Sequence, residues 1–203
     1  MKKIIAVLGA GLFAITLTAC GSSSIEASIG SDKVTVSDIK TSVNSILAER
    51  KKVDTTGMNL PTGDALDLYE LNFHLIAYLL ADTAAQNGVS ITPDEIAARR
   101  ASIVSQVGSE SGMPKALVGA NIAPADFPMY LKTVLYEEGL AKKVQAQGVT
   151  TANTQGALQK LVSIVSEKLK VKVYPKYGIW DSTHSVVTAP SGTAPAPTPS
   201  TSK

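Results

Sequence analysis

His74 lies on a stripe of side chains whose chemistry suits a metal ion. It follows Asp67 by seven residues and Glu70 by four, so on a helix the three side chains share one face. Imidazole nitrogens and carboxylate oxygens are common zinc ligands. The same stripe is typical of acidic residues that favour a helix start, and of a histidine that faces solvent or a partner group. No further ligand spacing accompanies it, and we therefore predict no metal ion and no cofactor.

Other catalytic arrangements are also missing from the sequence. The second histidine, His184, lies near a C-terminal stretch of Ser, Thr, Pro and Ala residues. The chain contains no phosphate-binding glycine loop and no Ser-His-Asp order, and its single cysteine is Cys20. We predict no catalytic residues, so that the protein is not an enzyme. An enzyme of another type remains an alternative, which a bound metal or an ordered polar pocket would favour.

Cys20 follows a segment with the features of a signal peptide. Two lysines precede an apolar run over residues 4–15, which is too short to anchor the chain across a bilayer. The segment ends in a motif that resembles the bacterial lipobox, whose cysteine sulfur accepts a diacylglycerol: Leu17-Thr18-Ala19-Cys20-Gly21. The alternative is a secreted protein cut after Ala19, with Cys20 as a free thiol.

The lipobox predicts where the mature protein is located. Residues 1–19 are the expected signal peptide, and residues 20–25 are a short tether lipidated at Cys20. Two acyl chains are enough for durable membrane attachment without a transmembrane helix. We therefore expect a lipid-anchored protein on the extracytoplasmic face of the cell membrane.

The composition limits the partners of the mature chain. The full sequence has 19 Lys and Arg residues against 17 Asp and Glu residues, and removal of Lys2 and Lys3 with the signal peptide makes the two counts equal. A neutral chain argues against nucleic acid as a partner. With Cys20 lipidated, no disulfide can form, so the domain must be stabilised by buried apolar surface.

The patterning of apolar residues predicts a mainly helical domain over residues 26–181. Residues 27–36 read as two short strands around a turn, followed by a helix capped by Ser37. The segment 64–86 is apolar over much of its circumference and is the expected central helix. Further helices are expected at 93–106, with Thr92 as the cap, and then at 114–118, 125–147 and 154–169.

The two ends of this domain are expected to meet. Val171 and Val173 lie in an extended segment that can pair with the early strands, which gives a small antiparallel β element joining the N- and C-terminal ends. Residues 182–203 are rich in Ser, Thr, Pro and Ala, and we predict that this tail is disordered.

Both ends of the domain resemble one family. Residues 27–39, with the sequence ASIGSDKVTVSDI, are similar to the opening of exported chaperones of the SurA and PrsA type. Residues 171–181, VKVYPKYGIWD, are similar to the closing segment of the same family, although Tyr174 and Lys176 depart from its usual Asn-Pro-Arg-Tyr-Gly. The turn at Gly30-Ser31 also departs from the frequent Asn-Gly.

This resemblance implies a SurA N-terminal-like helical domain that binds unfolded or partly folded exported polypeptides. Many members also carry a parvulin-type prolyl isomerase domain, for which the residues after Asp181 leave no room. The alternative is a lipoprotein that uses the same scaffold for one fixed cell-envelope or secretion partner.

Apolar residues around the loosest part of the chain are the candidates for polypeptide binding. Methionine suits varied partners because its side chain is flexible and polarisable. The same residues are also spaced as a helical core would be. The candidates are Met113, Leu117, Val118, Phe127, Met129 and Tyr130.

Overall fold

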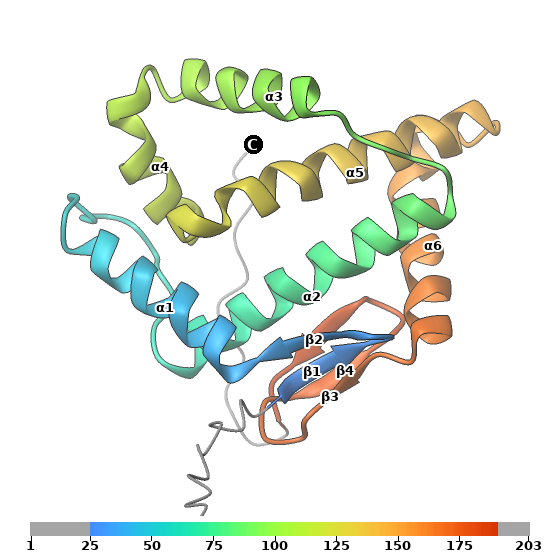
Figure 1. Ribbon diagram of the computed structural model, residues 1–203, viewed down its shortest axis with the longest axis horizontal. Coiled ribbons are helices and arrows are strands. Elements are labelled where there is room, and N and C mark those ends of the chain that lie inside the picture. Colours follow the sequence, from blue (N-terminus) through green and yellow to red (C-terminus); the bar gives the residue numbers. More distant parts are fainter. Residues whose placement is uncertain (1–24, 191–203) are drawn as a thin grey trace, which may run out of the picture.

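The computed structural model describes residues 25–190, which form a mainly helical domain with small antiparallel sheets (Figure 1). The predicted fold class is therefore confirmed. The predicted signal peptide and the predicted lipidation site at Cys20 lie outside the described residues. Between residues 25 and 190, no helix has both the length and the hydropathy needed to cross a membrane.

A three-stranded sheet joins the two ends of the domain. Strand β1 (Ile25–Ile29) lies between β2 (Asp32–Thr35) and β3 (Lys172–Val173), and both pairings are antiparallel. The register places Ala27 opposite Val173. Gly30, in the turn between β1 and β2, has a φ of 56° and donates its N–H to the carbonyl of Leu169 at 2.9 Å. The expected pairing of the N- and C-terminal segments is thus present.

Helix α1 (Val36–Arg50) begins two residues earlier than the sequence predicts. Its cap is Thr35, not Ser37, because Thr35 and Asp38 form a capping box. The Thr35 hydroxyl accepts the Asp38 N–H at 3.2 Å, and the Asp38 carboxylate accepts the Thr35 N–H at 2.9 Å. Val36 is consequently the first helical residue and not part of a strand.

Helix α2 (Asp64–Gln86) is the central helix, as predicted. It contacts α1, α5 (Phe127–Ala146), α6 (Thr154–Leu169) and the sheet. Figure 1 shows α2 between the sheet on one side and α5 on the other. Leu66, Leu75 and Leu79 on this helix have no exposed surface. Burial of such leucines contributes roughly 1.5–3 kcal/mol each.

The remaining helices form an arm on the far side of α5. Helix α3 (Pro93–Gln106) has the predicted capping box between Thr92 and Glu95, and α4 (Met113–Ala120) follows the short 3-10 helix η1 (Glu110–Gly112). A second 3-10 helix, η2 (Pro124–Asp126), leads into α5, and a third, η3 (Thr151–Asn153), leads into α6. No residue of α3 is buried.

The folded domain extends beyond Asp181, so the predicted start of the disordered tail at residue 182 is wrong. Strand β4 (Ile179–Asp181) pairs with β5 (Val186–Thr188) as an antiparallel hairpin. Val187, on β5, is only 2% exposed. Residues 191–203 of the predicted tail lie outside the part of the chain that is described.

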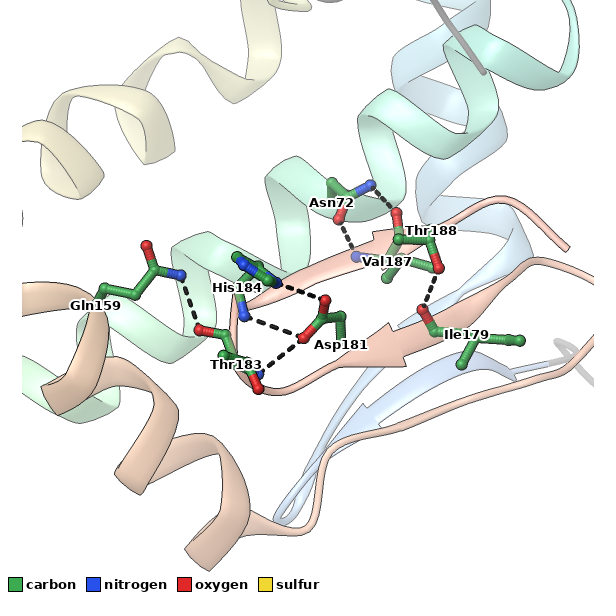
Figure 2. A network of polar contacts seen from close by, with 8 residues as sticks. All are labelled: Asn72, Gln159, Ile179, Asp181, Thr183, His184, Val187 and Thr188. Atoms are coloured by element: carbon green, nitrogen blue, oxygen red, sulfur yellow. Dashed lines mark hydrogen bonds and ion pairs between the residues drawn. The ribbon is translucent and has the colours of Figure 1, made fainter. Parts of the chain in front are cut away.

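Side chains from two helices and from β4 hold this hairpin in place (Figure 2). Asn72 of α2 accepts the Val187 N–H at 2.6 Å and donates to the Val187 carbonyl at 3.1 Å. Asp181 accepts the backbone N–H groups of Thr183 and His184, and its carboxylate pairs with the His184 ring at 2.6 Å. Gln159 of α6 donates to the Thr183 carbonyl at 3.0 Å. Val187 is buried in the hydrophobic core and Trp180 packs against it, so the hairpin is ordered by apolar packing together with these polar contacts.

Candidate functional site

A group of polar side chains is enclosed where α1, α2 and η2 meet. We call it the polar cluster; its members are Ser42, Glu70, His74 and Asp126. Glu70 and His74 lie four residues apart on α2, so the helix presents both in the same direction. Asp126 is brought to them by the 3-10 turn before α5, and Ser42 by the middle of α1.

The side chains of the polar cluster are close enough to share one ligand. One ligand atom each from Glu70, His74 and Asp126 lies within 4.8 Å of the other two. His74 Nε2 is 3.9 Å from Asp126 Oδ2. Ser42 Oγ donates to that same carboxylate oxygen at 2.5 Å and lies 3.3 Å from His74 Nε2.

Glu70 is the least solvated member of the polar cluster. Glu70 is 1% exposed, and neither of its carboxylate oxygens has a hydrogen-bond partner among the described residues. Burial raises the pKa of Glu70 to about 8, with a further contribution from the Asp126 charge, while Arg50 acts in the opposite direction. Arg50 directs its guanidinium elsewhere, to the Pro61 carbonyl at 2.7 Å and the Asn121 side chain at 2.8 Å.

His74 is held in a setting that favours its neutral form. It is 6% exposed, and this burial lowers the pKa of the His74 ring, against the opposing charges of Asp126 and Asp38. A neutral imidazole can donate a lone pair, which is what a metal ligand requires.

The arrangement does not resemble that of a nucleophilic enzyme. A serine nucleophile gives its proton to histidine, whereas Ser42 donates to the Asp126 carboxylate. Ser42 is 4% exposed and Glu70 is 1% exposed, so a substrate has no route to the hydroxyl in this conformation. The chemistry best matched to these groups is the enclosure of a small cation or a proton.

The sequence correctly predicts that Glu70 and His74 share one face of a helix. Of the two surroundings expected for His74, solvent or a partner group, the structure has the second, because the ring is buried beside Asp126 and Ser42. Asp67, the third member of the predicted stripe, instead forms an ion pair with Lys40 at 2.5 Å. Because Asp126 lies far along the chain, spacing alone could not add it to the stripe. The sequence could have indicated that Ser42 is buried, because this polar residue lies on the same face of α1 as the apolar residues Ile39 and Ile46.

The six candidates for polypeptide binding lie on two successive helices, three on α4 and three at the start of α5. Met113, Val118 and Phe127 are buried, so they do not present a free surface in this conformation. Met113 and Phe127 belong to a small core that we call the arm core, whose buried residues are Met113, Ile122, Phe127 and Leu131. Leu117 and Tyr130 pack against it while partly exposed, and the Phe127 and Tyr130 rings stack with centroids 6.2 Å apart. Met129 is also partly exposed.

Comparisons with known proteins found no similar protein. Neither the family models, nor the curated proteins, nor the solved structures contain a match to the chain.

Proposed function

We propose that this protein is a membrane-anchored, extracytoplasmic chaperone that binds unfolded or partly folded secreted polypeptides without isomerase activity. The observation that carries the proposal is the incomplete burial of the arm helix α3. Helix α3 buries none of its residues, yet four of its side chains or near neighbours pack in part against the arm core: Ile96, Ile103, Val104 and Val107. This face is therefore apolar and incompletely covered.

Such a face suits the capture of extended apolar segments. A partly exposed apolar surface gains free energy when a client covers it, at about 25 cal/mol per Å². The arm core is also separate from the main core, which is organised around α2 and the sheet. A client could therefore displace the packing of α3 without disturbing the larger core.

The family resemblance is a second support for the proposal. The two segments that resemble exported chaperones of the SurA and PrsA type are residues 27–39 and 171–181. Strands from these two segments pair, through Ala27 opposite Val173 and Ser28 opposite Lys172. The resemblance implies such an arrangement, in which the two ends of the domain pair beside a helical body.

The mature protein should slow the aggregation of several unrelated unfolded proteins without ATP. Ile103→Ser should reduce this protection several-fold, because it removes an apolar contact from the α3 face. Ile164→Ser is the matched control, since Ile164 is 54% exposed on α6 and should leave protection unchanged. Light scattering at increasing molar ratios measures the effect, and circular dichroism checks that both variants fold.

The same assay separates the chaperone from the second candidate, a lipoprotein that recognises one fixed cell-envelope or secretion partner. A chaperone accepts many clients, whereas a fixed-partner module accepts few. Failure to protect any of the unrelated clients at several-fold molar excess would favour the fixed partner.

Membrane attachment should depend on Cys20. Cys20→Ala removes the sulfur that would carry the lipid, so the variant should leave the membrane fraction or accumulate as an uncut precursor. Cys20→Ser is a control of similar size that also lacks the thiol and should behave in the same way. Cell fractionation and the mass of the mature N-terminus measure this result. A Cys20→Ala protein that matures and fractionates like the wild type would show that the anchor is not at this residue.

A further inference from the structure

We propose that Glu70, His74 and Asp126 bind one divalent transition-metal ion, and that the ion is zinc. The sequence offered only the stripe of Asp67, Glu70 and His74 on one helix. The fold replaces Asp67 by Asp126, and this third ligand comes from a different part of the chain.

The geometry is compatible with a zinc ion after small side-chain rotations. Zinc binds imidazole nitrogen and carboxylate oxygen at about 2.0–2.2 Å in a tetrahedron, so neighbouring ligand atoms lie roughly 3.4 Å apart. The distance from His74 Nε2 to Asp126 Oδ2 is 3.9 Å, and all three ligand atoms lie within 4.8 Å. Because two ligands share one rigid helix, only the Asp126 turn and the flexible end of Glu70 need to adjust.

The unpartnered carboxylate of Glu70 is the independent sign that a ligand belongs here. A buried carboxylate is normally satisfied by hydrogen bonds or by a cation. Both oxygens of Glu70 lack a hydrogen-bond partner within residues 25–190, and the residue is 1% exposed. It lies in the same enclosure as His74 and Asp126, and a divalent cation would also offset the two carboxylate charges.

The donor set favours zinc over the harder cations. Calcium and magnesium prefer oxygen ligands alone, whereas an imidazole together with carboxylates suits zinc and its neighbours in the first transition row. Three protein ligands leave a fourth position open. Ser42 Oγ lies beside two of the ligands, at 2.5 Å from Asp126 and 3.3 Å from His74, where it can bind the ion or a water molecule on it.

Such an ion would connect the main body to the arm. Glu70 and His74 belong to α2 in the main core, while Asp126 belongs to the turn between the arm helix α4 and helix α5. Zinc would thus fix the turn that joins the arm helix α4 to α5. This role goes beyond the proposed chaperone function and does not depend on it.

Calorimetric titration of the full mature chain with zinc, after treatment with EDTA and in detergent, tests the proposal. We expect one ion per chain and a higher melting temperature in the presence of zinc. Asp126→Asn and His74→Gln should each lower the affinity by at least about tenfold, since even the loss of outer-shell partners costs 10–100-fold. Asp67→Asn and His184→Gln are matched controls outside the polar cluster and should bind zinc as the wild type does.

A cobalt measurement on the wild type keeps the test independent of how the variants fold. Co²⁺ in a tetrahedral site with one nitrogen and several oxygen ligands absorbs strongly in the visible range, and zinc should displace it at a ratio of one to one. Three results would overturn the proposal: no binding of zinc, equal zinc affinity in Asp126→Asn and the wild type, or a cobalt spectrum of an octahedral ion. Tighter binding of Mn²⁺ than of Zn²⁺ would overturn the assignment of the metal.

Discussion

Removal of residues 186–203 should lower the melting temperature of the protein by roughly 10 °C. The cut deletes β5, whose Val187 is 2% exposed and pairs with Trp180 on β4. Loss of the buried valine costs about 1.5–3 kcal/mol. Asn72 also loses both of its hydrogen bonds to Val187, which costs about 1–3 kcal/mol where the amide stays unpaired. In a domain of this size, each kcal/mol corresponds to about 2–4 °C.

A second truncation controls for the length of the tail. Removal of residues 191–203 deletes only a segment rich in Pro, Ser, Thr and Ala, so the melting temperature should stay within about 1 °C of the full chain. Differential scanning calorimetry of both truncations gives the comparison. Equal melting of the two truncations would mean that the β4–β5 hairpin adds nothing to the stability of the domain.

The hairpin also shows why this part of the fold was not predictable from composition. Its strands are only three residues long, and the segment around them is polar. What orders β5 is the side chain of Asn72, which lies 115 residues earlier in the chain. The sequence around β5 gives no indication of a partner so far away in the chain. By contrast, the end of α2 at Gln86 and the capping box of α3 depend on neighbouring residues and were predicted correctly.

The polar cluster, like the hairpin, was predictable from the sequence only in part. The spacing of Glu70 and His74 predicts that they share one side of a helix, which the structure confirms. The sequence could not tell whether that side faces solvent or the interior, because this depends on how α1 and η2 pack against α2. The Thr35 cap shows the same limit on a smaller scale, since Thr35 and Ser37 are both good capping residues and Asp38 completes the box with only one of them.

Without a bound cation, the protein should lose stability as the pH rises from 6.5 to 9. Burial raises the pKa of Glu70 from 4.5 to about 8. The folded state therefore holds a proton that the unfolded state releases above pH 4.5. The contribution of Glu70 is fully present below pH 4.5 and is lost as the pH rises towards 8. Each pKa unit corresponds to about 1.4 kcal/mol, so the part lost above pH 6.5 is about 2 kcal/mol.

The pH range is chosen so that His74 does not interfere. Burial lowers the pKa of His74 from its usual value of 6.5. His74 therefore affects stability only below about pH 6.5, where the unfolded state binds a proton that the folded state does not. Urea unfolding in the presence of EDTA, repeated across the range, gives the free energy of unfolding at each pH. Chelation keeps any metal ion away from the carboxylate during the measurement.

Glu70→Gln should remove most of this pH dependence, because a glutamine keeps the shape of the protonated carboxyl group and cannot ionise. The free energy of unfolding of the variant should stay nearly constant between pH 6.5 and 9, so that its excess over the wild type grows by about 2 kcal/mol across this range. Glu137→Gln is the matched control, since Glu137 is exposed on α5 and should keep the wild-type pH profile. A wild-type profile in the Glu70→Gln variant would show that Glu70 is already ionised at neutral pH. In that case a neighbouring cation, and Arg50 first among the described side chains, must approach its carboxylate more closely than the contacts of Arg50 with Pro61 and Asn121 allow.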